Sequence, residues 1–226
     1  MASKSSPAHT AGLSVRTPVW AAAVALVAFL ALLASASDFL PWATGFDLDV
    51  HAWFVAHRTA GWTTAAAVIT STASSAYTAP LVFLVAAALT RGSVRARLTR
   101  AVLVLLLMLS AVLGRFAISE LIARPRPPTA DWAVYAGGLS FPSGHTSDAA
   151  LAAGLIAWLV VRRFDRAPRW PVWLVAAGYA LLIAWTRVYL GVHWPTDVLG
   201  SLAFVTAWLS AALVFRRLDE RVATSS

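Results

Sequence analysis

The chain has 226 residues, of which 59% are hydrophobic and 12% are charged, and its formal net charge is +8. A soluble domain is about half apolar and about one quarter charged, so this composition excludes an ordinary soluble fold and indicates a membrane protein. Cysteine is absent, which excludes disulfides and cysteine-ligated metals. The positive charge lies in short arginine clusters beside apolar stretches, so nucleic acid is not an expected partner. One lysine against seventeen arginines, with abundant alanine, is typical of a GC-rich bacterial genome.

Six apolar runs are long enough to cross a membrane as helices, since a bilayer core needs about 20 mostly apolar residues per span. They are expected at residues 18–37, 62–89, 101–118, 146–161, 171–190 and 196–215. The first run ends in Ala34-Ser35-Ala36, which resembles a signal-peptidase site, so its cleavage is the alternative to its retention as a helix. We therefore predict an all-α fold, a polytopic membrane bundle with about six transmembrane helices.

The segments outside these spans differ in character. Three parts are expected: a flexible cytoplasmic tail at residues 1–17, a six-helix membrane domain at 18–216 and a cytoplasmic tail at 217–226. Residues 38–61 place apolar side chains at helical spacing, which is typical of a helix lying along the membrane surface. Pro80 is expected to kink the second span. The segment 120–145 is too rich in proline and glycine for a regular helix.

Arginine clusters predict the orientation of the chain. They occur at residues 91–100, 162–169 and 216–221, after the second, fourth and sixth spans. The positive-inside rule places all three in the cytoplasm, so both termini are cytoplasmic and the loops after the first, third and fifth spans are outside. The expected location is the inner membrane of a bacterial cell, with the outer loops facing the periplasm.

The outer loops carry three clusters of polar residues. These are Arg124 and Arg126 after the third span, Ser143, Gly144 and His145 before the fourth, and Arg187, His193 and Asp197 between the fifth and sixth. Each cluster has an ordinary structural interpretation, because arginines near helix ends reach lipid headgroups and a serine before a helix is a good N-cap. Their common side and complementary chemistry favour a single site.

Phosphate is the ligand that this chemistry fits. Arginine forks bind phosphate oxygens in a bidentate way, and Arg126 and Arg187 are the best candidates, with Arg124 a further one. Gly144 at a helix start lets backbone N–H groups approach an anion, and Ser143 can add a hydroxyl donor.

Two histidines with different partners suit a two-step transfer. Asp197 lies one turn beyond His193, so its carboxylate can hold Nδ1–H and leave Nε2 as the nucleophile. His145 can protonate the departing oxygen. The product would be a phosphohistidine that water then hydrolyses, and no metal or other cofactor is required because arginines and a helix N-terminus supply the positive charge.

These residues resemble the membrane type 2 phosphatidic acid phosphatase (PAP2) family, which is related to vanadium haloperoxidases. The family pattern has three parts, Lys-x6-Arg-Pro, Pro-Ser-Gly-His and Ser-Arg-x5-His-x3-Asp. Residues 142–145, "PSGH", match the second part, and residues 186–197, "TRVYLGVHWPTD", match the third with Thr186 where serine is usual. The resemblance implies a six-helix architecture, with His145 as the acid and His193 as the nucleophile.

The first part of the family pattern is incomplete in this chain. Arg126-Pro127 fits its end, which places Ser119 at the lysine position, and a shift to Arg124-Pro125 places Ala117 there. The phosphate-binding lysine of the family is therefore missing. We expect Arg115, one helical turn before Ser119, to replace it.

The expected function is metal-independent hydrolysis of a lipid phosphate or diphosphate at the outer membrane face. Candidate substrates are a polyprenyl phosphate or diphosphate of cell-envelope synthesis such as undecaprenyl diphosphate, phosphatidic acid, and phosphatidylglycerol phosphate. The alternative is a PAP2-like protein with weakened or lost activity that binds phospholipid headgroups. A metal site of two histidines and an aspartate is less favoured because the arginines would repel the cation, and a haloperoxidase because those relatives are soluble. The sequence does not distinguish the lipid chain, the number of phosphates or the oligomeric state.

Overall fold

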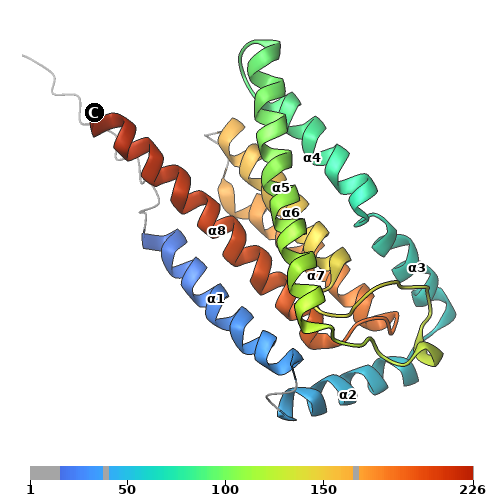
Figure 1. Cartoon of the computed structure of the whole chain (residues 1–226). Helices are drawn as coiled ribbons and strands as arrows, with labels where there is room; N and C mark the ends of the chain where they lie inside the picture. The colour runs from blue at the N-terminus through green and yellow to red at the C-terminus, as the bar shows by residue number, and fades with distance from the viewer. Residues whose placement is uncertain (1–15, 38–40, 165–167, 226) are drawn as a thin grey trace, which may run out of the picture.

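The computed structural model describes residues 16–37, 41–164 and 168–225, so most of the predicted tail at residues 1–17 lies outside the described residues. The described part contains helices and no strand. The elements are α1 (Arg16–Ala36), α2 (Pro41–Ala56), α3 (Ala60–Ser71), α4 (Ser75–Leu89), α5 (Val94–Ile122), the 3-10 turn η1 (Thr129–Asp131), α6 (Gly144–Arg163), α7 (Arg169–Tyr189) and α8 (Pro195–Ser225). They form an elongated bundle with α2 lying across one end (Figure 1).

The distribution of apolar side chains is that of a membrane bundle. Five helices (α1, α5, α6, α7 and α8) are long and apolar enough to cross a membrane, and α3 with α4 forms a sixth if the pair is one broken span. Large apolar side chains on the outside, such as Leu113 and Val175, are 69% and 73% exposed, whereas the charged Arg115, Asp148 and Arg187 are buried. In a bilayer this arrangement sets hydrocarbon against lipid and keeps ionisable groups inside the bundle. The prediction of a polytopic bundle with about six transmembrane helices is confirmed.

The second span is broken at a different place from the one predicted. α3 and α4 meet at an angle of 49° across residues 72–74, whereas Pro80 lies inside α4. At the break the backbone N–H groups of Thr72, Ala73 and Ser74 bond to carbonyls three residues back, and the Ser74 side chain accepts a bond from the N–H of Ala76. A run of small polar residues therefore makes the bend, because it satisfies the backbone groups that the break releases.

Two other helices are longer than their predicted spans. α5 begins at Val94, where the Ser93 hydroxyl accepts a bond from the N–H of Ala96, and it continues to Ile122. Part of the first arginine cluster is therefore helical. α8 continues past residue 215 to Ser225.

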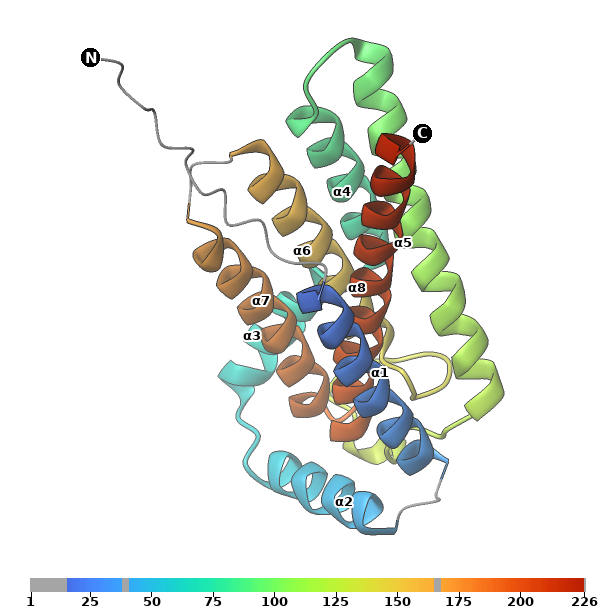
Figure 2. The same cartoon turned by 90° about the vertical axis from the view of Figure 1, so that its left-hand side faces the viewer.

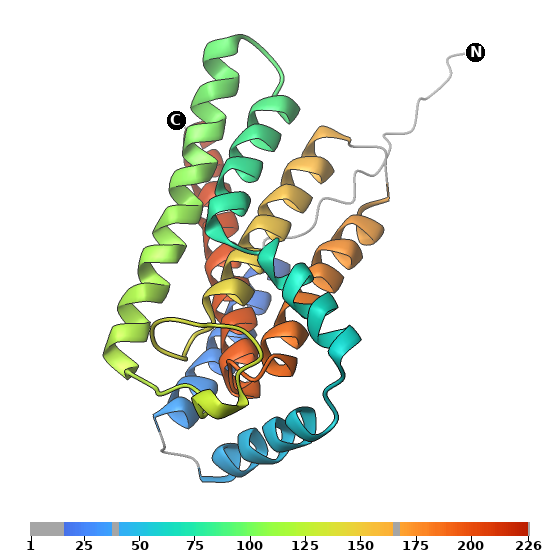
Figure 3. The same cartoon turned by 90° about the vertical axis from the view of Figure 1, so that its right-hand side faces the viewer.

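The connections that carry arginine clusters and the connections that carry the predicted site residues lie at opposite ends of the bundle. The α4–α5 connection, the C-terminal end of α6 and the N-terminal end of α7 are at one end, together with the C-terminal end of α8 (Figures 1 and 3). The α5–α6 and α7–α8 connections are at the other end, beside α2. The predicted site segments and the arginine clusters are thus separated by the length of the bundle.

The core fixes the segment before α6 against α8. Helices α1 and α8 lie side by side (Figure 2), and Phe29 and Phe204 from them pack with Phe141. Phe141 is completely buried, and a Cβ on Gly200 would collide with its ring. This close approach brings residues 142–145 to the same place as the start of α8.

Candidate active site

The three predicted clusters converge at the end of the bundle that α2 covers. They surround a cavity of about 310 Å³. Six of the nine predicted site residues line it: Arg115, Arg126, Gly144, His145, Arg187 and His193. Ser119, at the position of the missing lysine, lines it as well. Ser143, Arg124 and Asp197 are not part of the lining.

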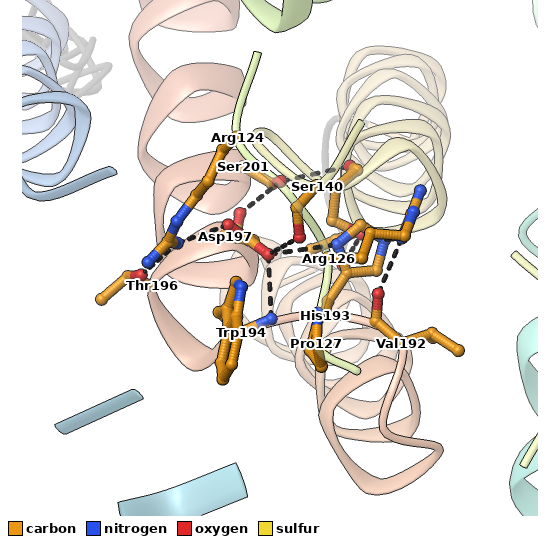
Figure 4. A network of polar contacts seen from close by, with 12 residues as sticks. Arg124, Arg126, Pro127, Ser140, Val192, His193, Trp194, Thr196, Asp197 and Ser201 are labelled. Atoms are coloured by element: carbon orange, nitrogen blue, oxygen red, sulfur yellow. Dashed lines mark hydrogen bonds and ion pairs between the residues drawn. The ribbon is translucent and has the colours of Figure 1, made fainter. Parts of the chain in front are cut away.

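His193 lies in the turn between α7 and α8. This turn needs Gly191, whose φ is 73° and whose Cβ position is occupied by the backbone carbonyl of Asp131. Nδ1 of His193 is 3.3 Å from Oδ2 of Asp197, and Nε2 is 2.7 Å from a guanidinium nitrogen of Arg126 (Figure 4). Because a guanidinium only donates, Nε2 is the acceptor and the ring proton is on Nδ1, facing the carboxylate. The predicted tautomer of His193 follows from these contacts.

The environment of His193 keeps its ring neutral. The pKa of His193 is lowered to about 3, mainly by burial and also by the nearby Arg126 and Arg187, while Asp197 opposes them in part. The Nε2 lone pair is therefore present at physiological pH. A neutral imidazole held by a carboxylate is the form that nucleophilic catalysis requires.

Asp197 is fixed through both of its oxygens. Oδ2 accepts bonds from the Ser140 hydroxyl and from the backbone N–H of Trp194, the latter at 2.8 Å, in addition to Nδ1 of His193. Oδ1 accepts a bond of 2.6 Å from Arg124. The carboxylate has no freedom to turn, so it sets the orientation of the histidine ring.

Arg124 does not occupy the place that the sequence predicted for it. Its guanidinium is buried between two carboxylates, 2.6 Å from Asp197 and 2.6 Å from Asp47 of α2. Burial lowers the pKa of Arg124, but the two carboxylates outweigh this and the net pKa is raised. Both terminal nitrogens donate to Asp47, Thr196 and Asp197, and Arg124 does not line the cavity, so the structure assigns it to holding Asp197 rather than to phosphate.

Arg126 is placed by backbone carbonyls. It donates to the carbonyls of Gly137 at 2.8 Å and Gly138 at 3.0 Å. Figure 4 shows its bond of 2.7 Å to the carbonyl of Val192 and its contact with His193. Burial lowers the pKa of Arg126, and the nearby Arg115 lowers it as well, while Asp197 opposes this. The guanidinium is thus held beside Nε2 of His193.

Arg115 and Arg187 supply positive charge that no described carboxylate within 4 Å neutralises. Arg187 is 3% exposed and donates to the Thr70 hydroxyl at 3.2 Å. Arg115 lies over the start of α6, since a Cβ on Gly144 would be 3.6 Å from its guanidinium carbon. Among the described residues, Nε of each arginine has no hydrogen-bond partner. Both therefore retain donors for an anion in the cavity.

The start of α6 presents Gly144 and His145 to the cavity. The helix begins at Gly144, so its first N–H groups and its positive dipole end are directed there. Ser143 differs from the prediction: its side chain is completely buried and accepts a bond from the Thr146 hydroxyl at 3.1 Å. The Ser143 hydroxyl does not reach the cavity, because the preceding segment is packed against α8.

Sequence reasoning missed two carboxylates near the site. Asp47 accepts hydrogen bonds from the backbone N–H and the hydroxyl of Thr196, at 2.9 and 2.6 Å. The two residues are 149 positions apart, so this contact leaves no local pattern in the sequence. Asp148 lines the cavity three residues after His145. Its position one helical turn beyond Gly144 was the available signal.

The fold and the cavity define a multi-pass helical membrane protein with a cavity lined by two histidines and three arginines. A family model described as "PAP2 superfamily" matches residues 100–222, more than half of the chain. The chain belongs to the PAP2 superfamily.

Known relatives agree with this family. Phosphatidylglycerophosphatase B of Bacillus subtilis (strain 168) is 40% identical over 88 residues, which cover 38% of this chain and 43% of that protein. An undecaprenyl-diphosphatase of Sulfolobus acidocaldarius is 34% identical over 71 residues, covering 31% of this chain and 30% of the relative. The chain thus spans less than half the length of these curated relatives. The crystal structure of a transmembrane PAP2 type phosphatidylglycerolphosphate phosphatase from Bacillus subtilis matches with a TM-score of 0.76 and 27% identity, over 90% of this chain and 98% of that one.

Proposed function

We propose that the protein is a lipid phosphate phosphatase that works through a phosphohistidine on His193 and needs no metal. One observation carries this proposal: Nε2 of a neutral, carboxylate-held His193 lies in the same cavity as His145 and three guanidinium groups. Relatives named as phosphatidylglycerophosphatase and undecaprenyl-diphosphatase support a lipid phosphate as the substrate.

The first step of the proposed reaction transfers the phosphoryl group from the lipid oxygen to Nε2 of His193. Nε2 of His193 attacks the phosphorus while the bond from phosphorus to the lipid oxygen breaks, and His145 gives its proton to that oxygen. Arg126 turns its donor from Nε2 to a phosphate oxygen as the new bond forms. Arg115, Arg187 and the first N–H groups of α6 stabilise the charge on the other phosphate oxygens.

The second step regenerates the histidine. His145, now neutral, takes a proton from water as the water oxygen attacks the phosphorus. The bond between phosphorus and Nε2 breaks, and inorganic phosphate leaves. Asp197 keeps Nδ1–H in place through both steps, so the ring returns to the same tautomer.

Phosphate release by detergent-purified protein in the presence of EDTA tests the proposal. The panel comprises phosphatidylglycerol phosphate, phosphatidic acid and undecaprenyl diphosphate. The wild type and His57→Ala, a variant of an exposed histidine outside the cavity, should release phosphate, and His193→Ala should not. Full activity of His193→Ala, or no release from any lipid by the wild type, would refute the proposal.

The proposed orientation sets the cavity at the periplasmic face of a bacterial inner membrane. It rests on the arginine clusters at the other end of the bundle. Since the chain has no cysteine, a single cysteine can report the side of each loop. A membrane-impermeant thiol reagent should label Thr129→Cys in intact cells and leave Ser93→Cys unlabelled, and the opposite pattern would reverse the orientation.

A further inference from the structure

The cavity contains a carboxylate that the proposed mechanism does not use. Asp148 is 5% exposed, and its Oδ2 accepts a bond of 2.7 Å from the Ser75 hydroxyl. Its Oδ1 has no hydrogen-bond partner within the described part of the chain. Coulombic attraction to Arg115 offsets part of the Asp148 charge, but it supplies no donor to Oδ1. A buried oxygen without a donor is uncommon, so Oδ1 is the atom of Asp148 that needs a separate explanation.

One face of α6 leads from the phosphate-binding end of the cavity to Asp148 and then to a second cavity. Gly144 and His145 are at the start of the helix, and Asp148 lies about one turn further along, four residues or about 6 Å beyond Gly144. The next positions of that face line a second cavity of about 530 Å³ between α4, α6 and α7: Ala152, Ala153, Ile156, Ala157 and Val160. The spacing of three and four residues keeps all of them on one side of the helix.

The second cavity is an apolar groove open to the lipid side. Leu81 and Val175 on its rim are 50% and 73% exposed. Thr72 lines the groove, whereas Ser75, just after the helix break, lines the first cavity. The hydrogen bond between Ser75 and Asp148 therefore lies where the two cavities approach each other.

The length of the groove fits a hydrocarbon chain. Its α6 lining runs from Ala152 to Val160, eight residues or roughly 12 Å along the helix. One leaflet contributes about 15 Å of hydrocarbon to the membrane. The groove, which starts beside the cavity and extends into the membrane, is suited to the tail of the lipid whose phosphate is at His193.

We propose that Asp148 accepts a hydrogen bond from a hydroxyl that lies between the phosphate and the tail of the substrate. The inference rests on the proposed function and names its substrate class: a lipid phosphomonoester whose phosphate is carried by a glycerol-like group with a free hydroxyl. The hydroxyl donates the hydrogen bond that Oδ1 of Asp148 lacks, and the tail lies in the groove between α4, α6 and α7. A polyprenyl diphosphate would place its second phosphate directly at the position of this glycerol group, beside Asp148, where like charges repel. The phosphodiester of phosphatidylglycerol phosphate lies beyond the hydroxyl, further from Asp148.

The test compares two substrates that differ in one hydroxyl. These are phosphatidylglycerol phosphate and an analogue with the same tails whose headgroup hydroxyl is replaced by hydrogen. We expect the wild type to prefer the first by about 10- to 100-fold in kcat/KM, because the analogue leaves a buried carboxylate oxygen without a donor. Asp148→Ala should bring the ratio close to one, and the control Asp49→Asn, on the exposed side of α2, should keep it.

A second variant guards against failure of Asp148→Ala to fold. Asp148→Asn removes the charge at nearly constant shape, so kcat/KM for undecaprenyl diphosphate should rise about tenfold. An unchanged ratio in Asp148→Ala, or no gain with diphosphate in Asp148→Asn, would overturn the assignment. If the wild type releases phosphate from neither substrate, the phosphatase proposal itself fails and this inference fails with it.

The tail groove has its own readout. Ala153→Phe should narrow the groove, so the loss in kcat/KM should be greater for a long-chain substrate than for a short-chain one. Leu113→Phe, on the exposed face of α5 and outside both cavities, is the control and should show no such dependence on chain length. Equal losses for both chain lengths in Ala153→Phe would place the tail elsewhere.

Discussion

Arg115 is the residue whose removal should reveal how the site works without the family lysine. It is 8% exposed, lies over Gly144 at the start of α6 and lines the cavity with Ser119, which is one turn further along α5. An alanine at position 115 would remove the positive charge that lies over the first backbone N–H groups of α6. The positions of Ser119 and Arg115 on one face of α5 mean that a longer side chain from the earlier turn reaches the place a lysine would take.

The magnitude follows from what the guanidinium can bind. Two charge-assisted hydrogen bonds to phosphate oxygens at about 1.5 kcal/mol each give about 3 kcal/mol, or roughly 10²-fold in kcat/KM. Loss of a donor that acts mainly on the transition state costs about 10²- to 10³-fold. Phosphate release from phosphatidylglycerol phosphate by Arg115→Ala should therefore fall at least about 10²-fold.

A second substitution separates chemistry from folding. Arg115→Ala combined with Ser119→Lys restores a cation at the position where the family pattern has one, so the double variant should recover at least about tenfold of the lost activity. Thermal unfolding of both variants checks that the fold is retained. Activity of Arg115→Ala within twofold of the wild type would refute a phosphate-binding role for Arg115.

Three further predictions concern the polar network behind His193. Asp47→Ala should lower the free energy of unfolding by about 3–5 kcal/mol, because it leaves the buried Arg124 without one of its two carboxylates; a loss below about 1 kcal/mol in thermal or denaturant unfolding would contradict this. Asp197→Asn should lower kcat by about 10³- to 10⁴-fold with KM little changed, because Nδ1–H loses its carboxylate, and steady-state kinetics with kcat intact would refute it. The pKa of His193 is about 3 in the folded protein against an ordinary value of 6.5, so below pH 6.5 only the unfolded chain takes up that proton and stability falls as the pH falls towards 3. Between pH 7 and pH 5 this amounts to about 2 kcal/mol, which His193→Gln should abolish in pH-dependent unfolding, and equal slopes for both proteins would contradict it.

The membrane architecture could be predicted because a bilayer leaves a strong mark on sequence. A span needs a long apolar run whatever its neighbours are, so the six predicted runs correspond to α1, the α3–α4 pair, α5, α6, α7 and α8. The predicted ends of the spans were less accurate. A helix such as α5 continues beyond its apolar run because a cap such as Ser93 and packing against other helices support the extra turns. The bend before α4 was misplaced because proline gives a stronger sequence signal than a run of serine and threonine.

The site was predictable where its geometry is local. His193 and Asp197 are four positions apart, so a helix start brings them together, and Gly144 and His145 are adjacent. Arg124 was misassigned because its partner Asp47 comes from α2, 77 positions earlier in the chain. Ser143 was misassigned because the packing of Phe141 against Gly200 turns its hydroxyl into the protein. Contacts of this kind depend on the tertiary fold and leave no spacing in the sequence.

The stereochemical course at phosphorus tests the central claim most directly. A lipid substrate with an isotopically chiral terminal phosphorothioate would be hydrolysed in isotopically labelled water, and the configuration of the released thiophosphate determined. Two successive in-line displacements, first by His193 and then by water, predict net retention. Net inversion would show a single attack by water and would contradict the phosphohistidine mechanism.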